Sequence, residues 1–398
     1  MGSLLRTTPV RILALTAALA FLAACGTAAG PASSTGTGPG NRSRQGSGAS
    51  PGTVLAASED QAPVAGTGNG RAAIPPRATA PSGGGTTVPG APNCPMFPAD
   101  NVWNTDISQL PVNAHSAAWM RSMDSASLDL HPDFGPNTGG FPFGIPYNIV
   151  TSAHPLVPVR FQYASESDKG PYPFGPDTLI EGGKNAGGDR HAIMVNKTTC
   201  TLYELWEARY SASGSTAGSG AIWNLTSNRL RPAGWTSADA AGLPILPGLL
   251  NYSQVKAAVK SGRPIAHAIR FTAQATQSAY LWPARHEAGS GTNPALPPMG
   301  ARFRLKASFD VAGFCASSVP NCADAKAVLT EMQHYGLILA DNGSDWFFQG
   351  SAYPQWPDGL VSLLKQIPAR AFQAVDESCL MVSPDSGRAA AKPGCPIG

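Results

Sequence analysis

The amino-acid sequence predicts a mainly β protein, a β-sandwich or jelly-roll-like single domain with a few peripheral helices. Three observations support this prediction. From residue 93 onward the chain contains many short runs of alternating apolar, β-branched or aromatic residues, bounded by turn-forming residues. Only three segments space their apolar residues as a helix does. No second linker rich in Pro, Gly and Ser interrupts residues 93–398, so we expect one folded body there.

The elements follow from local patterns along this body. The expected strands, in chain order, are residues 147–150, 156–163, 191–196, 201–210, 267–272, 279–282, 302–309 and 337–340. The expected helices are residues 253–260, 323–335 and 358–365. Gly262 and Gly336 follow the first two helices, where a glycine commonly ends a helix. The Gly/Ser-rich run at 211–220 lies between strand-like segments and is predicted to be a loop.

The start of the chain is typical of an exported protein. Arg6 and Arg11 precede an apolar run at 12–22, which is short for a membrane span and is followed by small residues, as in a secretory signal. The tetrapeptide LAAC that ends at Cys25 resembles the lipobox of bacterial lipoproteins. This resemblance implies that residues 1–24 are removed and that lipid on Cys25 anchors the protein to the outer face of the cell membrane. The alternative is an ordinary secretory signal with an incidental cysteine, which also exports the protein.

Residues 25–92 are predicted to form a lipidated, disordered tether. They are almost entirely Gly, Ser, Thr, Ala and Pro, and such a segment cannot bury enough apolar surface to offset its ordering entropy. The formal net charge of the whole chain is only +3, and 13% of its residues are charged. Nothing in this balance indicates a nucleic-acid partner.

The cysteines agree with an oxidising compartment. Cys25 is assigned to the lipid, which leaves six cysteines in the body: Cys94, Cys200, Cys315, Cys322, Cys379 and Cys395. We expect three disulfides and therefore no thiol nucleophile. Cys315 and Cys322 flank a short loop and are the easiest pair to close, whereas the other pairings stay open.

The richest stretch chemically is GGDRHAIMVNKTTCTLYELWEAR, residues 187–209, which reads as a β-hairpin. With Asn196 and Thr201 flanking the turn, Ile193 pairs with Glu204. One face of the hairpin then carries Asp189, His191, Ile193, Val195, Leu202, Glu204 and Trp206. On the other face, Arg190 and Glu207 are expected to form an opposite-charge pair. A slip of one residue in the register would regroup these faces.

A carboxylate, an imidazole and an indole on one sheet face are typical of a sugar-binding cleft. The indole offers an apolar platform, and a carboxyl group among apolar neighbours has a raised pKa suited to a general acid. We therefore take Asp189, His191, Glu204 and His286 as candidate catalytic residues. Candidate substrate-binding residues are Arg190, Trp206, Arg285 and Glu181. The alternative is that His191 and Glu204 only hydrogen-bond to each other or to the backbone beneath a loop.

Other polar residues carry weaker signals. His267 lies on the face of Ile269 and Phe271, as a core histidine does, and Arg270 points the other way. His286 follows a proline that ends a strand, so it lies on a loop, where working residues are common. Residues 341–345 contain Asn-Gly, a hairpin signal, and turn chemistry explains them better than a calcium site. Residues 93–398 lack the G-x-S-x-G, H-E-x-x-H and P-loop motifs, and no metal or cofactor is expected.

The body resembles an uncharacterised family of exported bacterial proteins of actinobacterial type. Four motifs carry the resemblance: GDRH at 188–191, LYEL at 202–205, WPARH at 282–286 and ADNGS at 340–344. The resemblance covers nearly all of the body and none of the tether. It implies that the body is one recurring unit, and it transfers no activity and no catalytic residue.

Two functional hypotheses from different classes remain. The first is a surface enzyme acting on polysaccharide. A hydrolase would use two carboxylates from Asp189, Glu204 and Glu181, and a lyase would use His191 or His286 with Arg190 or Arg285 near a uronate. The second is a non-catalytic carbohydrate-binding or envelope-structural lipoprotein. Convergence of Asp189, His191, Glu204 and His286 in one open cleft would favour the enzyme.

Overall fold

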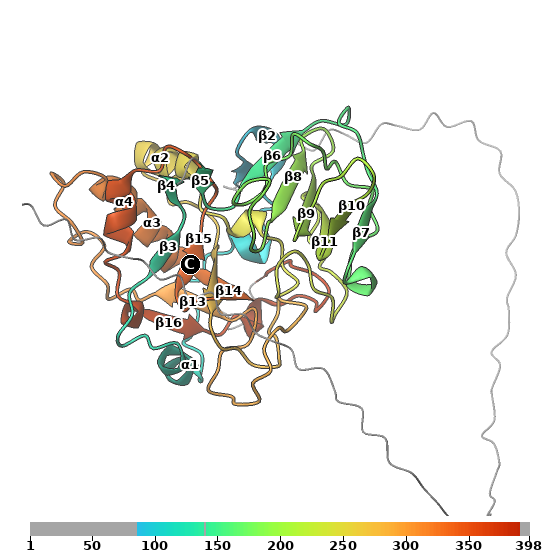
Figure 1. The fold of residues 1–398 in the computed structure, drawn as a ribbon. Coiled ribbons are helices and arrows are strands. Elements are labelled where there is room, and N and C mark those ends of the chain that lie inside the picture. Colours follow the sequence, from blue (N-terminus) through green and yellow to red (C-terminus); the bar gives the residue numbers. More distant parts are fainter. Residues whose placement is uncertain (1–85, 139–140, 391–398) are drawn as a thin grey trace, which may run out of the picture. The chain divides into compact units, whose positions relative to one another are not determined.

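Two sheets of different size dominate the computed structural model, which describes residues 86–138 and 141–390 (Figure 1). Strands outnumber helices in these ranges, so the prediction of a mainly β body with a few peripheral helices is confirmed. All of these residues belong to one unit, Pro76–Gly398.

The larger sheet has six strands and is mixed. Its order is β16-β13-β14-β12-β15-β3. Strands β12 and β14 run parallel, as do β15 and β3, while the remaining neighbours are antiparallel. The strands span His131–Asp133 (β3), Ile269–Ala273 (β12), Arg302–Leu305 (β13), Leu337–Asn342 (β14), Phe347–Gln349 (β15) and Phe372–Val375 (β16). Strands β12 and β13 are buried along their whole length, including the arginines that each contains.

The smaller sheet has four strands in the order β11-β9-β8-β6. These strands span Tyr147–Val150 (β6), Ala192–Asn196 (β8), Thr201–Trp206 (β9) and Ser219–Asn224 (β11). Strands β8 and β9 form the predicted hairpin in the predicted register, with Ile193 opposite Glu204 and Asn196 opposite Thr201. Strand β11 pairs antiparallel with β9, and β6 pairs parallel with β8.

Three short strand pairs complete the β structure. They are β1 (Thr87–Val88) with β2 (Ala91–Pro95), β4 (Gly135–Thr138) with β5 (Phe141–Phe143), and β7 (Val159–Phe161) with β10 (Ser215–Ala217). Val88 and Ala91 are buried, so β1 and β2 extend the body beyond the expected boundary at residues 92 and 93.

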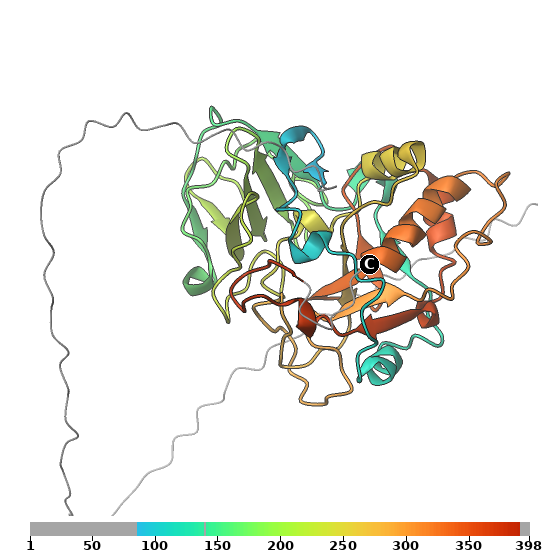
Figure 2. The same cartoon turned by 180° about the vertical axis from the view of Figure 1, so that it is seen from behind.

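The helices are few and lie at the periphery of the sheets. They are α1 (Ser116–Ser122), α2 (Tyr252–Ser261), α3 (Cys322–His334) and α4 (Asp358–Leu364). Short 3₁₀ turns are η1 (Val102–Asn104), η2 (Ala164–Glu166), η3 (Leu246–Gly248), η4 (Ala369–Ala371) and η5 (Ser378–Leu380). Helix α3 contacts β13, α2 and α4 beside the large sheet, as Figure 2 shows from behind. Asn251 caps the start of α2, and Gly262 ends it in the left-handed region (φ 66°), as the sequence predicted.

One hydrophobic core joins both sheets. Ile193, Val195 and Leu202 from the hairpin belong to the same buried cluster as Phe271 and Phe303 of the large sheet. The opposite face of the hairpin packs into a second cluster around Tyr172 and Phe174. The hairpin is therefore buried on both faces, and its polar residues lie inside the protein or at the ends of its strands.

The structure contains strands β1 to β5, β15 and β16 and helix α1, none of which was predicted, and it differs from the stated predictions in three further places. Residues 279–282 form only an isolated bridge through Tyr280 rather than a strand. The run at 211–220 contains β10 and the start of β11, because its small side chains allow close approach: a Cβ at Gly220 would collide with Phe161 and Tyr172. The Asn342–Gly343 pair makes no hairpin, because β15 returns to pair with β12 instead of β14.

The disulfides include the one pairing that the sequence favoured and one that it left open. Cys315 is bonded to Cys322, as expected, and Cys94 of β2 is bonded to Cys200 beside the hairpin turn. Cys379 also takes part in a disulfide. The predicted signal peptide, the lipid-bearing Cys25, most of the predicted tether and Cys395 lie outside the described residues. Within 86–138 and 141–390, none of the helices has the length and apolar character needed to cross a membrane.

Candidate functional site

A pocket of about 330 Å³ lies where the end of the β8–β9 hairpin meets the end of β14. This volume is within the usual range for small-ligand sites. Its lining comes from segments far apart in the sequence: Tyr163, Glu166, Asp189, Trp206, Ser219, Thr236, Ser237, Ala238, Asp239, Ala240, His286, Ala288, Asp341 and Asn342. Four carboxyl groups are among these residues, and no lysine or arginine is. The lining is therefore acidic.

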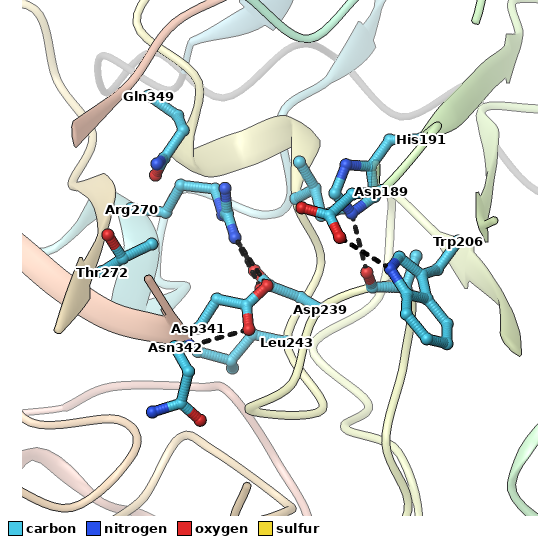
Figure 3. A network of polar contacts seen from close by, with 12 residues as sticks. Asp189, His191, Trp206, Asp239, Leu243, Arg270, Thr272, Asp341, Asn342 and Gln349 are labelled. Carbon is cyan, nitrogen blue, oxygen red and sulfur yellow. Dashed lines mark hydrogen bonds and ion pairs between the residues drawn. The ribbon is translucent and has the colours of Figure 1, made fainter. Parts of the chain in front are cut away.

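An arginine braces two of the four carboxyl groups from behind. Arg270 of β12 donates from Nε and Nη2 to the two carboxylate oxygens of Asp239, at 2.9 and 2.6 Å. The Arg270 Nη2 atom also lies 3.5 Å from Asp341 Oδ2 (Figure 3). Burial alone would lower the pKa of Arg270, but Asp239 raises it above its usual value, so the guanidinium stays charged.

Asp341 is the carboxyl group of this cluster that retains access to the pocket. Its side chain is 25% exposed, whereas that of Asp239 is fully buried. Burial, and next the charge of Asp239, raise the pKa of Asp341 well above the usual carboxyl range, and Arg270 and His191 only partly oppose this. Its Oδ1 accepts the N–H of Asn342 at 2.7 Å. Asp341 is thus a carboxyl group that holds its proton at neutral pH.

The facing side of the pocket combines an exposed carboxylate with aromatic rings. Trp206 donates from its indole nitrogen to Asp189 Oδ1 at 3.2 Å, and its ring lies 6.2 Å from that of Tyr163. A Cβ at Gly218 would collide with the Trp206 ring, so glycine at that position allows the indole to lie against the backbone. The indole is thereby held as a flat apolar surface beside Asp189.

His286 and Glu166 border the pocket on a third side. Nδ1 of His286 is 2.8 Å from the carbonyl oxygen of Ala240, and Nε2 is 3.8 Å from Glu166 Oε2. The predicted loop position of His286 therefore does bring it to the pocket. Of the candidate catalytic residues, Asp189 and His286 line the pocket, together with candidate binding residue Trp206.

His191 lies behind the pocket wall instead of in the lining. Its Nδ1 is 2.6 Å from Glu181 Oε2, and its Nε2 is 3.1 Å from the carbonyl oxygen of Ala238, which belongs to the lining. Burial opposes protonation, but the adjacent Glu181 outweighs it and raises the pKa of His191 to about 9. Burial likewise would raise the pKa of Glu181, and His191 instead holds it below the usual range. The pair is ionised at neutral pH and ties β8 to segment 236–240.

Glu204 is fully buried and lies outside the lining. Its two carboxylate oxygens accept the N–H of Ile245 at 3.0 Å, and Oε1 also accepts the N–H of Leu246 at 2.9 Å, at the start of η3. Burial raises the pKa of Glu204 to about 7, although these N–H donors lower it. Glu204 thus satisfies otherwise unpaired backbone donors of a buried turn.

The two candidate arginines are both buried and bonded to protein oxygens. The expected Arg190–Glu207 pair is wrong: Arg190 donates to the carbonyl oxygens of Ala208 and Ala186, at 3.0 and 2.6 Å for its terminal nitrogens. Both Arg190 and Glu207 have φ of 50°, which interrupts the strand alternation on which that expectation rested. Arg285 donates to the carbonyl oxygen of Arg231 and pairs with Asp385 at 2.5 Å.

Sequence patterns gave little sign of the braced carboxyl pair. Arg270 was correctly expected to point away from His267, which is a core histidine with 1% exposure and a pKa that burial lowers to about 4. Asp341 was read as turn chemistry, and Asp239 lies in a stretch without periodicity. One signal could have indicated this pair of carboxyl groups. Arg270 is a charged residue on a buried strand, and a buried arginine usually has a carboxylate partner.

Among residues 86–138 and 141–390, no group of three or more His, Cys, Asp or Glu side chains is arranged to hold a metal ion. No family profile, curated protein or solved structure matches the chain.

Proposed function

We propose that the protein is an exported, lipid-anchored glycoside hydrolase whose active site is the pocket lined by Asp341, Asp189 and Trp206. One observation carries the proposal: Asp341, a carboxyl group whose pKa is raised by burial and by Asp239, lines the same pocket as the exposed side chain of Asp189, beside an indole. Two carboxyl groups held in different protonation states are what hydrolysis of a glycosidic bond requires.

Each residue has a defined role in this mechanism. The Trp206 indole stacks on a sugar ring and places the glycosidic bond between the two carboxyl groups. Asp341 donates its proton to the departing glycosidic oxygen. Asp189 accepts a proton from the water that attacks the anomeric carbon. Asp239 and Arg270 act as positioning residues, because they set the charge around Asp341 without reaching the substrate.

The lining favours a hydrolase over a lyase. A lyase must neutralise the carboxylate of a uronate, usually with an arginine or lysine, whereas this lining contributes four carboxyl groups and no such cation. Arg190 and Arg285, the arginines that a lyase would use, do not line this pocket. We therefore assign neutral or amino-sugar polysaccharides as substrates and exclude uronates from this pocket.

The test is a screen of chitosan, chitin, β-glucans, alginate and pectin for released reducing sugars and for unsaturated uronates. Reducing ends are expected from the neutral or amino-sugar polymers, without unsaturated products. Asp341→Asn and Asp189→Asn should each lower kcat by about 10²- to 10⁴-fold, the usual contribution of an acid or base. Asp129→Asn, at an exposed aspartate outside the pocket, should leave kcat unchanged.

The activity should also have a diagnostic pH dependence. Because Asp341 must be protonated, kcat should fall as pH rises through its raised pKa. Burial is the main cause of this high pKa and the charge of Asp239 is the second. Asp239→Asn removes that charge and leaves Arg270 beside Asp341, so the alkaline limb should move to lower pH. Binding of a polymer without turnover would replace the enzyme with the carbohydrate-binding alternative. Wild-type kcat in Asp341→Asn would instead rule out Asp341 as the general acid.

A further inference from the structure

We propose that a second pocket, lined by Lys184, Arg190 and Arg209, binds the oxyanion of a sugar-sized ligand such as a phosphate ester, a sulfate ester or a uronate. This pocket has a volume of about 290 Å³. Asp189 lines the acidic pocket and Arg190 lines this one, so consecutive residues serve two sites. The inference does not depend on the proposed hydrolase.

The first argument is uncompensated positive charge. Three cationic side chains line the pocket, and no carboxylate does. None of the three belongs to an ion pair in the part of the chain that the structure describes. Buried charges in proteins are usually paired, because an unpaired one costs several kcal/mol. An anionic ligand would supply the missing partner.

Arg190 makes this argument strongest, because only 3% of it is exposed. Its guanidinium bonds to neutral acceptors alone, the carbonyl oxygens of Gly183, Ala186 and Ala208. Burial lowers the pKa of Arg190, and repulsion from Arg209 adds to this effect. The carbonyl bonds fix the guanidinium in place, and an anion between the two arginines would relieve their repulsion.

Neutral groups in the same pocket suit the remainder of such a ligand. Thr178 Oγ1 accepts the N–H of Gly175 at 2.9 Å, which leaves its hydroxyl hydrogen available to donate. Tyr210 packs edge-on against Phe174, with ring centroids 5.7 Å apart, and its ring forms part of the lining. An aromatic ring, that of Tyr210, beside cationic side chains suits a sugar ring that carries an acidic substituent.

The acidic pocket cannot serve such a ligand, because its four carboxyl groups would repel it. The two pockets therefore select opposite charges on either side of residues 189 and 190.

Isothermal titration calorimetry on the folded protein tests the anion site directly. The probes are inorganic phosphate, sulfate and glucuronate, each compared with chloride at constant ionic strength, so that unspecific screening is subtracted. Saturable binding of at least one probe is expected. Preference for phosphate or sulfate identifies an ester as the natural group, and preference for glucuronate identifies a uronate.

Matched double variants locate the binding. Lys184→Gln with Arg209→Gln should weaken the preferred probe about tenfold or more, the factor for loss of a charge-assisted hydrogen bond. Both residues are exposed, so the fold should persist, whereas buried Arg190 is left intact. Lys260→Gln with Arg263→Gln removes two exposed charges outside the pocket and should leave binding unchanged. No saturable binding above chloride, or equal weakening in both double variants, overturns the proposal.

Discussion

The Glu181 carboxylate lies 2.6 Å from Nδ1 of His191, and this ion pair stands between the core and the pocket wall. The His191 side chain is 4% exposed, so solvent screens the pair only weakly. Because Nε2 of the same ring is bonded to the Ala238 carbonyl oxygen, ionisation of the pair also fixes the backbone on which Asp239 is carried. Charge at His191 therefore supports the geometry of the pocket without contact with substrate.

This pair predicts a loss of stability at alkaline pH. The pKa of His191 is about 9 in the folded protein and 6.5 as the reference value, so its contribution is complete below pH 6.5 and is lost as pH rises through about 9. The contribution is on the order of 3 kcal/mol. Melting temperatures measured from pH 6 to pH 9.5 should fall by several degrees in the wild type.

Glu181→Gln should lower the melting temperature at pH 6 and flatten its decline with pH. The variant lacks the carboxylate that stabilises protonated His191, so loss of that proton at high pH no longer costs stability. Asp177→Asn is the matched control, since it removes a histidine–carboxylate pair, His154–Asp177, whose acid is 72% exposed. The control should retain the wild-type slope. Identical slopes in wild type and Glu181→Gln would show that His191 does not titrate as described.

At the scale of elements, the register of the β8–β9 hairpin was predictable, because it depends on a short turn and on neighbouring side chains. The second strand nevertheless ends at Trp206, four residues before its predicted end. The bounds of helices α2, α3 and α4 were also predicted within one or two residues, because helix periodicity is likewise a local property of the sequence. Strands β10 and β11 were missed, since their small residues reflect close packing against Phe161 and Tyr172, which are distant in sequence. Long-range pairing likewise overrode the Asn-Gly signal after β14.

The Cys94–Cys200 disulfide ties β2 to the hairpin turn, and its removal should be costly. The bonded residues are 106 apart in sequence, against 7 for Cys315 and Cys322. In the loop-entropy model the long closure contributes about 5 kcal/mol and the short one about 2 kcal/mol. Double Cys→Ser variants of each pair, compared by urea unfolding, should therefore differ by about 2.4 kcal/mol in free energy of unfolding. Equal losses would mean that native contacts, rather than chain closure, set the effect.

At the scale of the whole molecule, the site depends on convergence that local patterns do not encode. Asp189, Trp206 and His286 were identified because they are polar or aromatic residues at strand ends or on a loop after a strand. Asp239 and Asp341 are 102 positions apart and meet only because Arg270 lies between their segments. Glu204, by contrast, looked chemical in the sequence, and its partners are backbone N–H groups of a distant turn. Burial decided its role, and burial is a property of the complete fold.

The anchoring hypothesis also belongs to the whole molecule. We expect Cys25→Ala to release the protein from membranes or to leave it unprocessed, because lipid on this cysteine is the proposed anchor. Fractionation of expressing cells and the apparent mass of the product give the result. Ser47→Ala, a substitution elsewhere in the predicted tether, should change neither. A processed, membrane-bound Cys25→Ala product would contradict the lipid anchor.

The two disulfides whose partners are both described connect cysteines in their order along the chain. Each joins cysteines that are consecutive in the sequence, Cys94 to Cys200 and Cys315 to Cys322. When a chain crosses a membrane with its N-terminus leading, each of these thiols meets its native partner before any later thiol of the body arrives. If the body is exported as proposed, this order of arrival favours the two observed pairings over any pairing with a later cysteine.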